Sequence, residues 1–292
     1  MKRILIISAI CLLAGQNASP AGTWTTLDKP GASLTRIHGI NGNNFVGSAD
    51  GHGFLYDGEN WTTLDMPMAG TVTTTIYSID GGNLVGSYSN QIEQNRGLLY
   101  NGTTWTFLDA PGAGQTIARG IQGNNIVGYY YDVVGSTHGF LYNETDWTTL
   151  DMPGASNTLV LGIDGSNFVG GYRDTSGYYH GFLYNGTDWT TFDAPGATWT
   201  SICGIDGSNL IGSYKDTSNN YHGFLYNGAN WTALDMPGAS NTRIYGIDGS
   251  NLVGYYWDTP GYEHGFVYTI PEPASVFLLG FGIILAGKKL FQ

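Results

Sequence analysis

Short runs of alternating hydrophobic and polar residues, separated by glycine-rich turns, follow one another along most of this chain. Alternation with a period of two predicts β-strands, and no stretch between residues 22 and 268 has the period of a helix. One pattern, Gly-Ile-x-Gly-x-Asn-φ-Val-Gly with φ apolar, recurs with small departures. The spacing of its isoleucine is 39 residues once and 42 thereafter. The chain therefore contains six copies of one unit, and its isoleucines are Ile40, Ile79, Ile121, Ile163, Ile205 and Ile247.

Each unit contains enough alternating segments for four short strands. A His-Gly-Phe-Leu-Tyr segment follows the glycine pattern, with Arg96 replacing the histidine in the second unit and Val267 replacing the leucine in the sixth. A Trp-Thr-Thr-Leu-Asp segment usually comes next. In the last unit the first three strands are expected at Thr242–Ile247, Asn251–Tyr256 and Glu263–Tyr268. Four strands in about 42 residues are typical of a β-propeller blade.

The order of the strands at the two ends predicts a closed ring. The sixth unit stops at Tyr268 without a tryptophan strand, and a spare one, Trp24–Asp28, precedes the first unit. Pairing of Trp24–Asp28 with Gly265–Tyr268 would complete the sixth blade and leave no exposed sheet edge there. We therefore predict an all-β fold, a six-bladed β-propeller of four-stranded repeats closed by the N-terminal strand. The alternative is an open linear array.

The two ends of the chain differ from this central region. Residues 1–21 have a basic start, an apolar run and small residues near their end, which predicts a signal peptide; the alternative is a short buried helix. Residues 271–292 begin with Pro271-Glu272-Pro273, continue with an apolar stretch and end near Lys288 and Lys289. This stretch predicts a C-terminal hydrophobic helix, shorter than the ~20 residues of a full span. The predicted organisation is residues 1–21, 22–270 and 271–292.

Both parts resemble known families of exported proteins. The C-terminal order of Pro-Glu-Pro, apolar stretch and lysines resembles the PEP-CTERM sorting signal of Gram-negative bacteria. That resemblance implies an exosortase as partner, transient anchoring in the inner membrane, and release to the cell surface or to a matrix rich in exopolysaccharide. The alternative is a plain membrane anchor. The repeats over residues 22–268 resemble extracellular HAF repeats, with His-Gly-Phe in place of His-Ala-Phe, a resemblance that implies export and no particular activity.

Charge narrows the possible partners. The net charge is −12, and without the two terminal segments 7 basic and 22 acidic residues remain, or −15. Such a body repels nucleic acid and anionic lipid, so we expect no nucleic-acid partner. Cys11 lies in the predicted signal peptide, which leaves Cys203 as the one cysteine of the mature chain. We expect Cys203 to be a small buried hydrophobe.

The repeated polar residues are expected to build the fold. The histidine of each unit is predicted to hydrogen-bond to a nearby turn, because buried polar groups need partners. One histidine per blade puts neighbours too far apart for a shared zinc ion. Aspartates in turns such as Asp174–Gly177 are candidate ligands for a structural calcium ion, although the sequence lacks the pattern of a calcium-binding loop. We expect no cofactor, and the sequence does not decide whether the protein binds a metal ion.

Binding is expected where the units differ. The residue two before each repeated isoleucine is variable and alternates with an apolar residue, so it should face the central channel, as should nearby arginines. Another variable position follows each Val-Gly, and two tryptophans lie outside the repeat pattern. The alternative is that these side chains only plug the channel. The predicted ligand-binding residues are Arg36, His38, Tyr77, Arg119, Tyr131, Arg173, Trp199, Arg243, Tyr245 and Trp257.

No catalytic motif occurs in the sequence, and no catalytic residue is predicted. The first hypothesis is therefore an exported protein without catalysis that binds carbohydrate or protein through one propeller face. Exposed aromatic rings offer flat apolar surfaces to sugar rings. One alternative is a propeller enzyme acting on polysaccharide, a lyase or glycosidase, which would need acidic or histidine residues at one place on the channel. The other is a purely structural matrix component.

Overall fold

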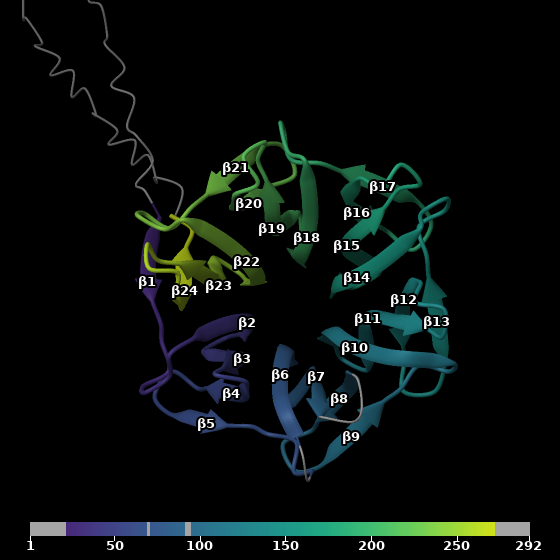
Figure 1. The fold of residues 1–292 in the computed structure, drawn as a ribbon, viewed down its shortest axis with the longest axis horizontal. Helices are drawn as coiled ribbons and strands as arrows, with labels where there is room; N and C mark the ends of the chain where they lie inside the picture. Colours follow the sequence, from purple (N-terminus) through teal and green to yellow (C-terminus); the bar gives the residue numbers. More distant parts are fainter. Residues whose placement is uncertain (1–21, 69–70, 91–94, 272–292) are drawn as a thin grey trace, which may run out of the picture.

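The computed structural model describes residues 22–68, 71–90 and 95–271. These residues form β-strands and turns, and the strands form six four-stranded blades around a central axis (Figure 1). One pairing between strands of the fourth and fifth blades joins these two blades into a single eight-stranded sheet. The fold is a six-bladed β-propeller, as predicted. The predicted signal peptide and the C-terminal segment with Glu272 and Pro273 lie outside the described residues. Within the described part of the chain, no helix is long and apolar enough to cross a membrane.

Each blade runs from an inner strand beside the axis to an outer strand at the rim. The inner strands are β2 (Thr35–Asn41), β6 (Thr71–Asp80), β10 (Ala113–Gln122), β14 (Asn157–Asp164), β18 (Trp199–Asp206) and β22 (Asn241–Asp248). The second strands are β3 (Asn44–Ala49), β7 (Asn83–Asn90), β11 (Asn125–Asp132), β15 (Asn167–Arg173), β19 (Asn209–Lys215) and β23 (Asn251–Trp257). The third strands are β4 (His52–Tyr56), β8 (Arg96–Tyr100), β12 (Thr137–Tyr142), β16 (Tyr179–Tyr184), β20 (Tyr221–Tyr226) and β24 (Glu263–Thr269). The outer strands are β5 (Trp61–Thr63), β9 (Trp105–Leu108), β13 (Trp147–Leu150), β17 (Trp189–Phe192), β21 (Trp231–Leu234) and, from the N-terminus, β1 (Thr23–Thr26).

The sixth blade contains strands from both ends of the chain. Strand β1 pairs antiparallel with β24, with Trp24 opposite Tyr268 and Thr26 opposite Phe266 (Figure 1). The carboxylate of Asp28, just beyond β1, accepts hydrogen bonds from the His264 ring at 2.7 Å and from the Gly265 N–H at 3.0 Å. The predicted ring closure is thus confirmed, and the alternative of an open array is wrong.

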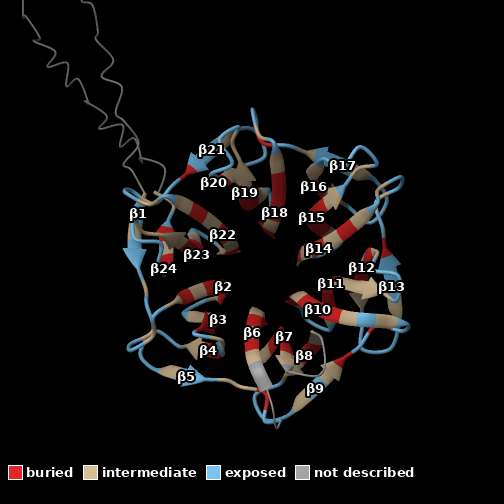
Figure 2. Ribbon diagram, viewed as in Figure 1, coloured by how far each residue is buried: buried red, intermediate tan, exposed pale blue. Residues whose placement is uncertain are grey.

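The core lies between neighbouring blades. The apolar residues that alternate with the variable channel positions are all fully buried: Ile37, Ile76, Ala118, Val160, Ile202 and Ile244. Figure 2 shows burial concentrated on the inner strands and exposure along the rim. Each outer tryptophan covers the aromatic residues of the third strand of its own blade. Trp189, for example, lies 4.4 Å from Tyr184 and 4.9 Å from Phe182 between ring centroids.

Every inner strand carries a β-bulge at the same place. In β14 the register shifts between Val160 and Gly162, so the intervening residue has no partner on β15, and the other five inner strands shift at the equivalent position. A bulge redirects the side chain of its extra residue. The bulge also presses a carbonyl against the second strand: a Cβ on Gly170 would overlap the carbonyl oxygen of Leu159. This contact explains the last glycine of the repeated pattern.

The repeated histidines and aspartates bind one another. His138 Nδ1 lies 2.7 Å from Asp151, which follows the outer strand, and its Nε2 lies 3.5 Å from Asp132 in the loop before it. Arg96 takes this place in the second blade and pairs with Asp109. The histidine therefore ties the third strand to two turns, which confirms the expected structural role. Equivalent histidines of the other blades are His52, His180, His222 and His264.

Candidate functional site

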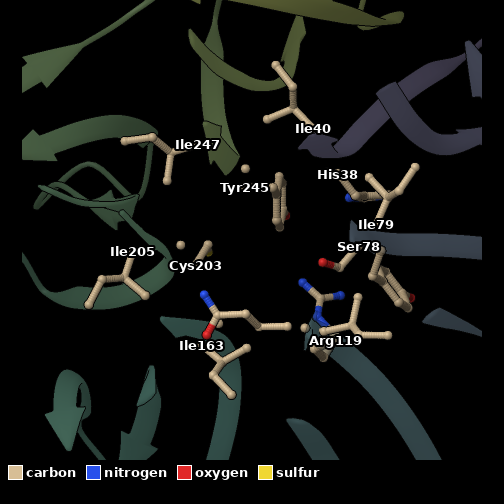
Figure 3. Close-up of a pocket in the computed structure, with 18 of the residues that line it drawn as sticks. His38, Ile40, Ser78, Ile79, Arg119, Ile163, Cys203, Ile205, Tyr245 and Ile247 are labelled. Atoms are coloured by element: carbon tan, nitrogen blue, oxygen red, sulfur yellow. The ribbon is translucent and has the colours of Figure 1, made fainter. Parts of the chain in front are cut away.

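The central channel opens on two faces of the disc. The turns between first and second strands define the hairpin face, and the loops between second and third strands, together with the links between blades, define the loop face. The six bulged residues lie between them: His38, Tyr77, Arg119, Leu161, Cys203 and Tyr245. All six line a cavity within the channel, and Figure 3 shows labelled side chains from all six blades around the open centre of this cavity.

On the hairpin side the channel is nearly symmetric. A cavity of about 190 Å³ is lined there by the six repeated isoleucines and by the residue after each of them. Four of these following residues are aspartates. Asp164 Oδ2 accepts a hydrogen bond from the N–H of Gly207 in the next blade at 2.9 Å, and Asp206 does the same for Gly249 at 2.7 Å. The hairpin side thus repeats one inter-blade contact at five of the six junctions between neighbouring blades.

On the loop side the channel is asymmetric. A second cavity, of about 160 Å³, is lined by residues of the third to sixth blades only. Trp199 and Tyr179 stack here with centroids 5.5 Å apart, at the point where β16 and β18 pair across two blades. The serine hydroxyls of Ser201 and Ser213 also line it, together with Arg243. The cavity therefore combines flat aromatic surface with hydroxyl and guanidinium donors.

Arg119 lies at the waist between the two cavities and lines both, as do Cys203 and Tyr245. Its guanidinium carbon is 4.0 Å from the centre of the Tyr77 ring and 5.9 Å from that of Tyr245. Its Nε is buried and has no hydrogen-bond partner in the described part of the chain. The positive charge is thus held by aromatic faces, which attract cations, and not by a carboxylate.

Arg243 has a similar environment nearer the loop face. Its guanidinium carbon lies 3.6 Å from the centre of the Tyr221 ring, and Nη1 donates a hydrogen bond to Tyr245 Oη at 3.1 Å. Tyr245 Oη is in turn 3.3 Å from Tyr255 Oη. Burial raises the pKa of Tyr245, so this phenol stays neutral and does not balance the charge of Arg243.

Arg36 differs because a carboxylate neutralises it. Its guanidinium makes two contacts with Glu263, of which the Nη2 to Oε1 hydrogen bond is 2.9 Å long. Glu263 is 8% exposed and is the only glutamate at the position before the repeated histidine. Sequence analysis missed Glu263, although its departure from the other units was a usable signal. Arg36 lines neither cavity, and ligand binding by Arg36 stays a prediction.

His38 is buried inside the channel at 8% exposure. Its ring lies 5.1 Å from those of Tyr77 and Tyr245, and no hydrogen bond reaches its Nδ1 from any described residue. Burial, and then the nearby charges of Arg119 and Arg36, lower the pKa of His38 well below its ordinary value. The imidazole is therefore neutral at pH 7 and adds an unused polar atom to the channel wall.

The remaining predicted ligand residues lie around the loop face. Trp257 packs 5.0 Å from Tyr255 and 5.8 Å from the guanidinium of Arg243, beside the loop-side cavity. Tyr131 packs 5.9 Å from Tyr129, which does line the cavity. Arg173 is exposed and its Nε binds the carbonyl of Gly177, so the structure does not bring it to the channel. Of the predicted set, His38, Tyr77, Arg119, Trp199, Arg243 and Tyr245 meet in the two cavities.

Cys203 is more exposed than the small buried hydrophobe that was predicted. It is the bulged residue of β18, is half-buried and lines the channel. Burial raises the pKa of its thiol, so the thiol stays protonated. The alternation of variable and apolar residues in the sequence had placed this position on the channel side, and the structure confirms that placement.

The carboxylates of the Asp174–Gly177 turn are already engaged by the protein. Asp174 Oδ1 accepts the N–H of Tyr178 at 2.8 Å, and Oδ2 lies 3.6 Å from His180 Nε2. Within the described residues, no group of three or more histidine, cysteine, aspartate or glutamate side chains gathers as metal ligands would. A calcium ion in these turns remains a prediction.

Comparison with known proteins gives the fold and no family. No protein-family model and no curated protein matches the sequence. Among solved structures, the SapL1 lectin in complex with α-methyl fucoside is 17% identical, with a TM-score of 0.55 over 83% of this chain and 98% of the lectin. The fungal Aleuria aurantia lectin, a six-bladed β-propeller, is 14% identical, with a TM-score of 0.49 over 84% of this chain and 99% of that one. The likeness to SapL1 shows that this chain shares the lectin's propeller fold.

Proposed function

We propose that this protein is a non-catalytic carbohydrate-binding propeller, exported to the cell surface or extracellular matrix. The observation that carries the proposal is the loop-side cavity, where stacked Trp199 and Tyr179 lie beside hydroxyl and guanidinium donors. Aromatic faces pack against the C–H groups of a sugar ring, and the polar groups orient its hydroxyls. The SapL1 lectin, which binds α-methyl fucoside, provides a precedent for a propeller of this shape in sugar binding.

The polysaccharide-enzyme alternative is weaker on chemical grounds. Glycoside hydrolysis uses two carboxylates on either side of the scissile bond. The described residues that line the loop-side cavity include no aspartate or glutamate, and Glu263, the acidic residue that departs from the repeat, is paired with Arg36. A purely structural matrix role remains the outcome to expect if no glycan binds.

Export and sorting form the second part of the proposal. It rests on the basic, apolar and small-residue order of residues 1–21 and on Pro271-Glu272-Pro273 with the apolar stretch and lysines that follow. An exosortase would then process the C-terminal signal after transient anchoring. Expression in a Gram-negative host with and without its exosortase tests this: mass spectrometry should find a C-terminus near residue 273 only when the enzyme is present. An intact C-terminus in both hosts would contradict the sorting proposal.

A glycan array tests carbohydrate binding directly. The full chain should bind a subset of glycans, and Trp199→Ala should weaken that binding by about tenfold to a hundredfold, because burying one large apolar side chain contributes roughly 1.5–3 kcal/mol. Tyr262→Ser is the matched control, since Tyr262 is an aromatic residue of the loop face, 55% exposed and outside both cavities. Failure of the unmodified protein to bind any glycan, with both variants folded, would remove the proposal.

A further inference from the structure

Two half-buried arginines of the channel, Arg119 and Arg243, have no counter-charge. Among the described residues, the arginines in ion pairs are Arg36, with Glu263, and Arg96, with Asp109. Arg119 and Arg243 have none, and the Nε of each is buried without a hydrogen-bond partner. Their neighbours are phenols and indoles. This occurs in a chain whose net charge is −12, so acidic residues are plentiful elsewhere.

The surrounding groups do not supply the missing negative charge. Burial raises the pKa values of Tyr129 and Tyr245, so both phenols are neutral at pH 7. The thiol of Cys203 is protonated for the same reason. A buried charge without a partner costs free energy, and stable proteins pair such charges or use them.

The fold does not require a positively charged side chain at the position of Arg119. The bulged residue that is Arg119 in the third blade is Leu161 in the fourth and Cys203 in the fifth. Neutral side chains therefore fit the same position of the ring. The unpartnered Nδ1 of His38, a residue only 8% exposed, adds a second polar atom that no described group satisfies. A plug made for stability would have no need of these polar atoms.

We infer that the channel waist binds a carboxylate of the ligand, so that the preferred glycans are acidic ones of the uronic-acid class. The inference rests on the proposed carbohydrate function and extends it. Arg119 and Arg243 both contact Tyr245, so one acidic group entering from the loop face meets two guanidinium groups. A planar guanidinium binds a carboxylate through paired hydrogen bonds, and low solvent exposure strengthens them.

Calorimetry with small probes on the full-length protein tests the inference. Methyl glucuronide should bind at least tenfold more tightly than methyl glucoside at pH 7 and low ionic strength, because a hydrogen bond to a charged group contributes about 1.5–3 kcal/mol. Arg119→Met and Arg243→Met should each abolish this preference. Lys29→Met is the matched control: it removes one positive charge from the loop face at a residue that lines neither cavity.

The outcomes separate this inference from the proposed function. Equal affinity for the two glycosides would overturn the acidic-ligand inference and leave carbohydrate binding standing. Binding of acetate with no gain from the sugar ring would overturn both. Binding of none of the probes would overturn the inference, and the glycan array would then decide the function alone.

Thermal unfolding without ligand gives an independent check. Removing a buried unpaired charge while keeping a side chain of similar length should raise the melting temperature of Arg119→Met by a few degrees, since ~1 kcal/mol shifts it by about 2–4 °C in a domain of this size. A fall in melting temperature would show that Arg119 is kept for stability, and would overturn the inference.

Discussion

The same six strands form both ends of the central channel, but the side chains repeat from blade to blade at one end and are unlike at the other. At the hairpin end the second to sixth blades each offer the same contact, a carboxylate or amide oxygen that accepts a glycine N–H of the next blade, as in Asp164 to Gly207. At the loop end the third to sixth blades offer unlike side chains, among them Tyr179, Trp199 and Arg243. Repeated residues hold neighbouring blades together at one end, and unrepeated residues form the candidate binding surface at the other.

The largest expected effect tests the repeated part of the fold. Trp24→Ala should destabilise the protein by about 3 kcal/mol, because Trp24 packs 4.9 Å from Phe266 and 4.6 Å from Tyr268. The equivalent change Trp189→Ala, within the fourth blade, should cost about the same, which denaturant unfolding measures. A much smaller loss for Trp24→Ala would show that β1 contributes little to the closed ring.

A change at the hairpin end should separate stability from binding. Asp164 accepts hydrogen bonds from Gly207 N–H and, at 3.2 Å, from Gln122 Nε2, so Asp164→Ala should cost about 2 kcal/mol. Glycan binding at the loop end should not change. Asp164→Asn keeps an acceptor oxygen and should cost about half as much. Loss of glycan binding in folded Asp164→Ala would mean that the two ends do not act separately.

The smallest effect concerns pH. Hydrogen bonds to Asp151 and Asp28 raise the pKa values of His138 and His264. The folded state therefore holds these protons more tightly, and their contribution is complete below about pH 6.5 and disappears as pH rises through the raised values. The side chains are partly exposed, so each pair should contribute less than about 1 kcal/mol.

His38 should act in the opposite direction. Its pKa is lowered by burial, so its contribution is present above about pH 6.5 and disappears as pH falls. Melting curves between pH 5 and 8.5 should show a weaker alkaline decline in His264→Gln and a weaker acid decline in His38→Gln. Unchanged slopes in both variants would contradict these assignments.

Much of the fold was predictable because its signals are local or periodic. The spacing of 42 residues predicted the six blades, and the displaced strand Trp24–Asp28 predicted how the ring closes. Alternation placed Ile37 and its equivalents correctly in the core. Six of the ten predicted ligand residues line the cavities because they occupy variable positions of inner strands that all face one axis.

The remaining features of the site depend on contacts between segments far apart in the chain. Arg36 and Glu263 are 227 positions apart, and only closure of the ring brings them together. Trp199 and Tyr179, which stack in the loop-side cavity, likewise belong to two different blades. A pattern within one unit contains no information about such pairings.

The sequence by itself determined the number of blades, their strand order, the closing strand and the core positions, because a period of two and a repeat of 42 residues are properties of the chain alone. Only the tertiary structure decided which arginines keep their charge unpaired. The reason is that the deciding contacts join different blades: ring closure brings Glu263 to Arg36, whereas Arg119 and Arg243 meet tyrosine rings of the neighbouring blades.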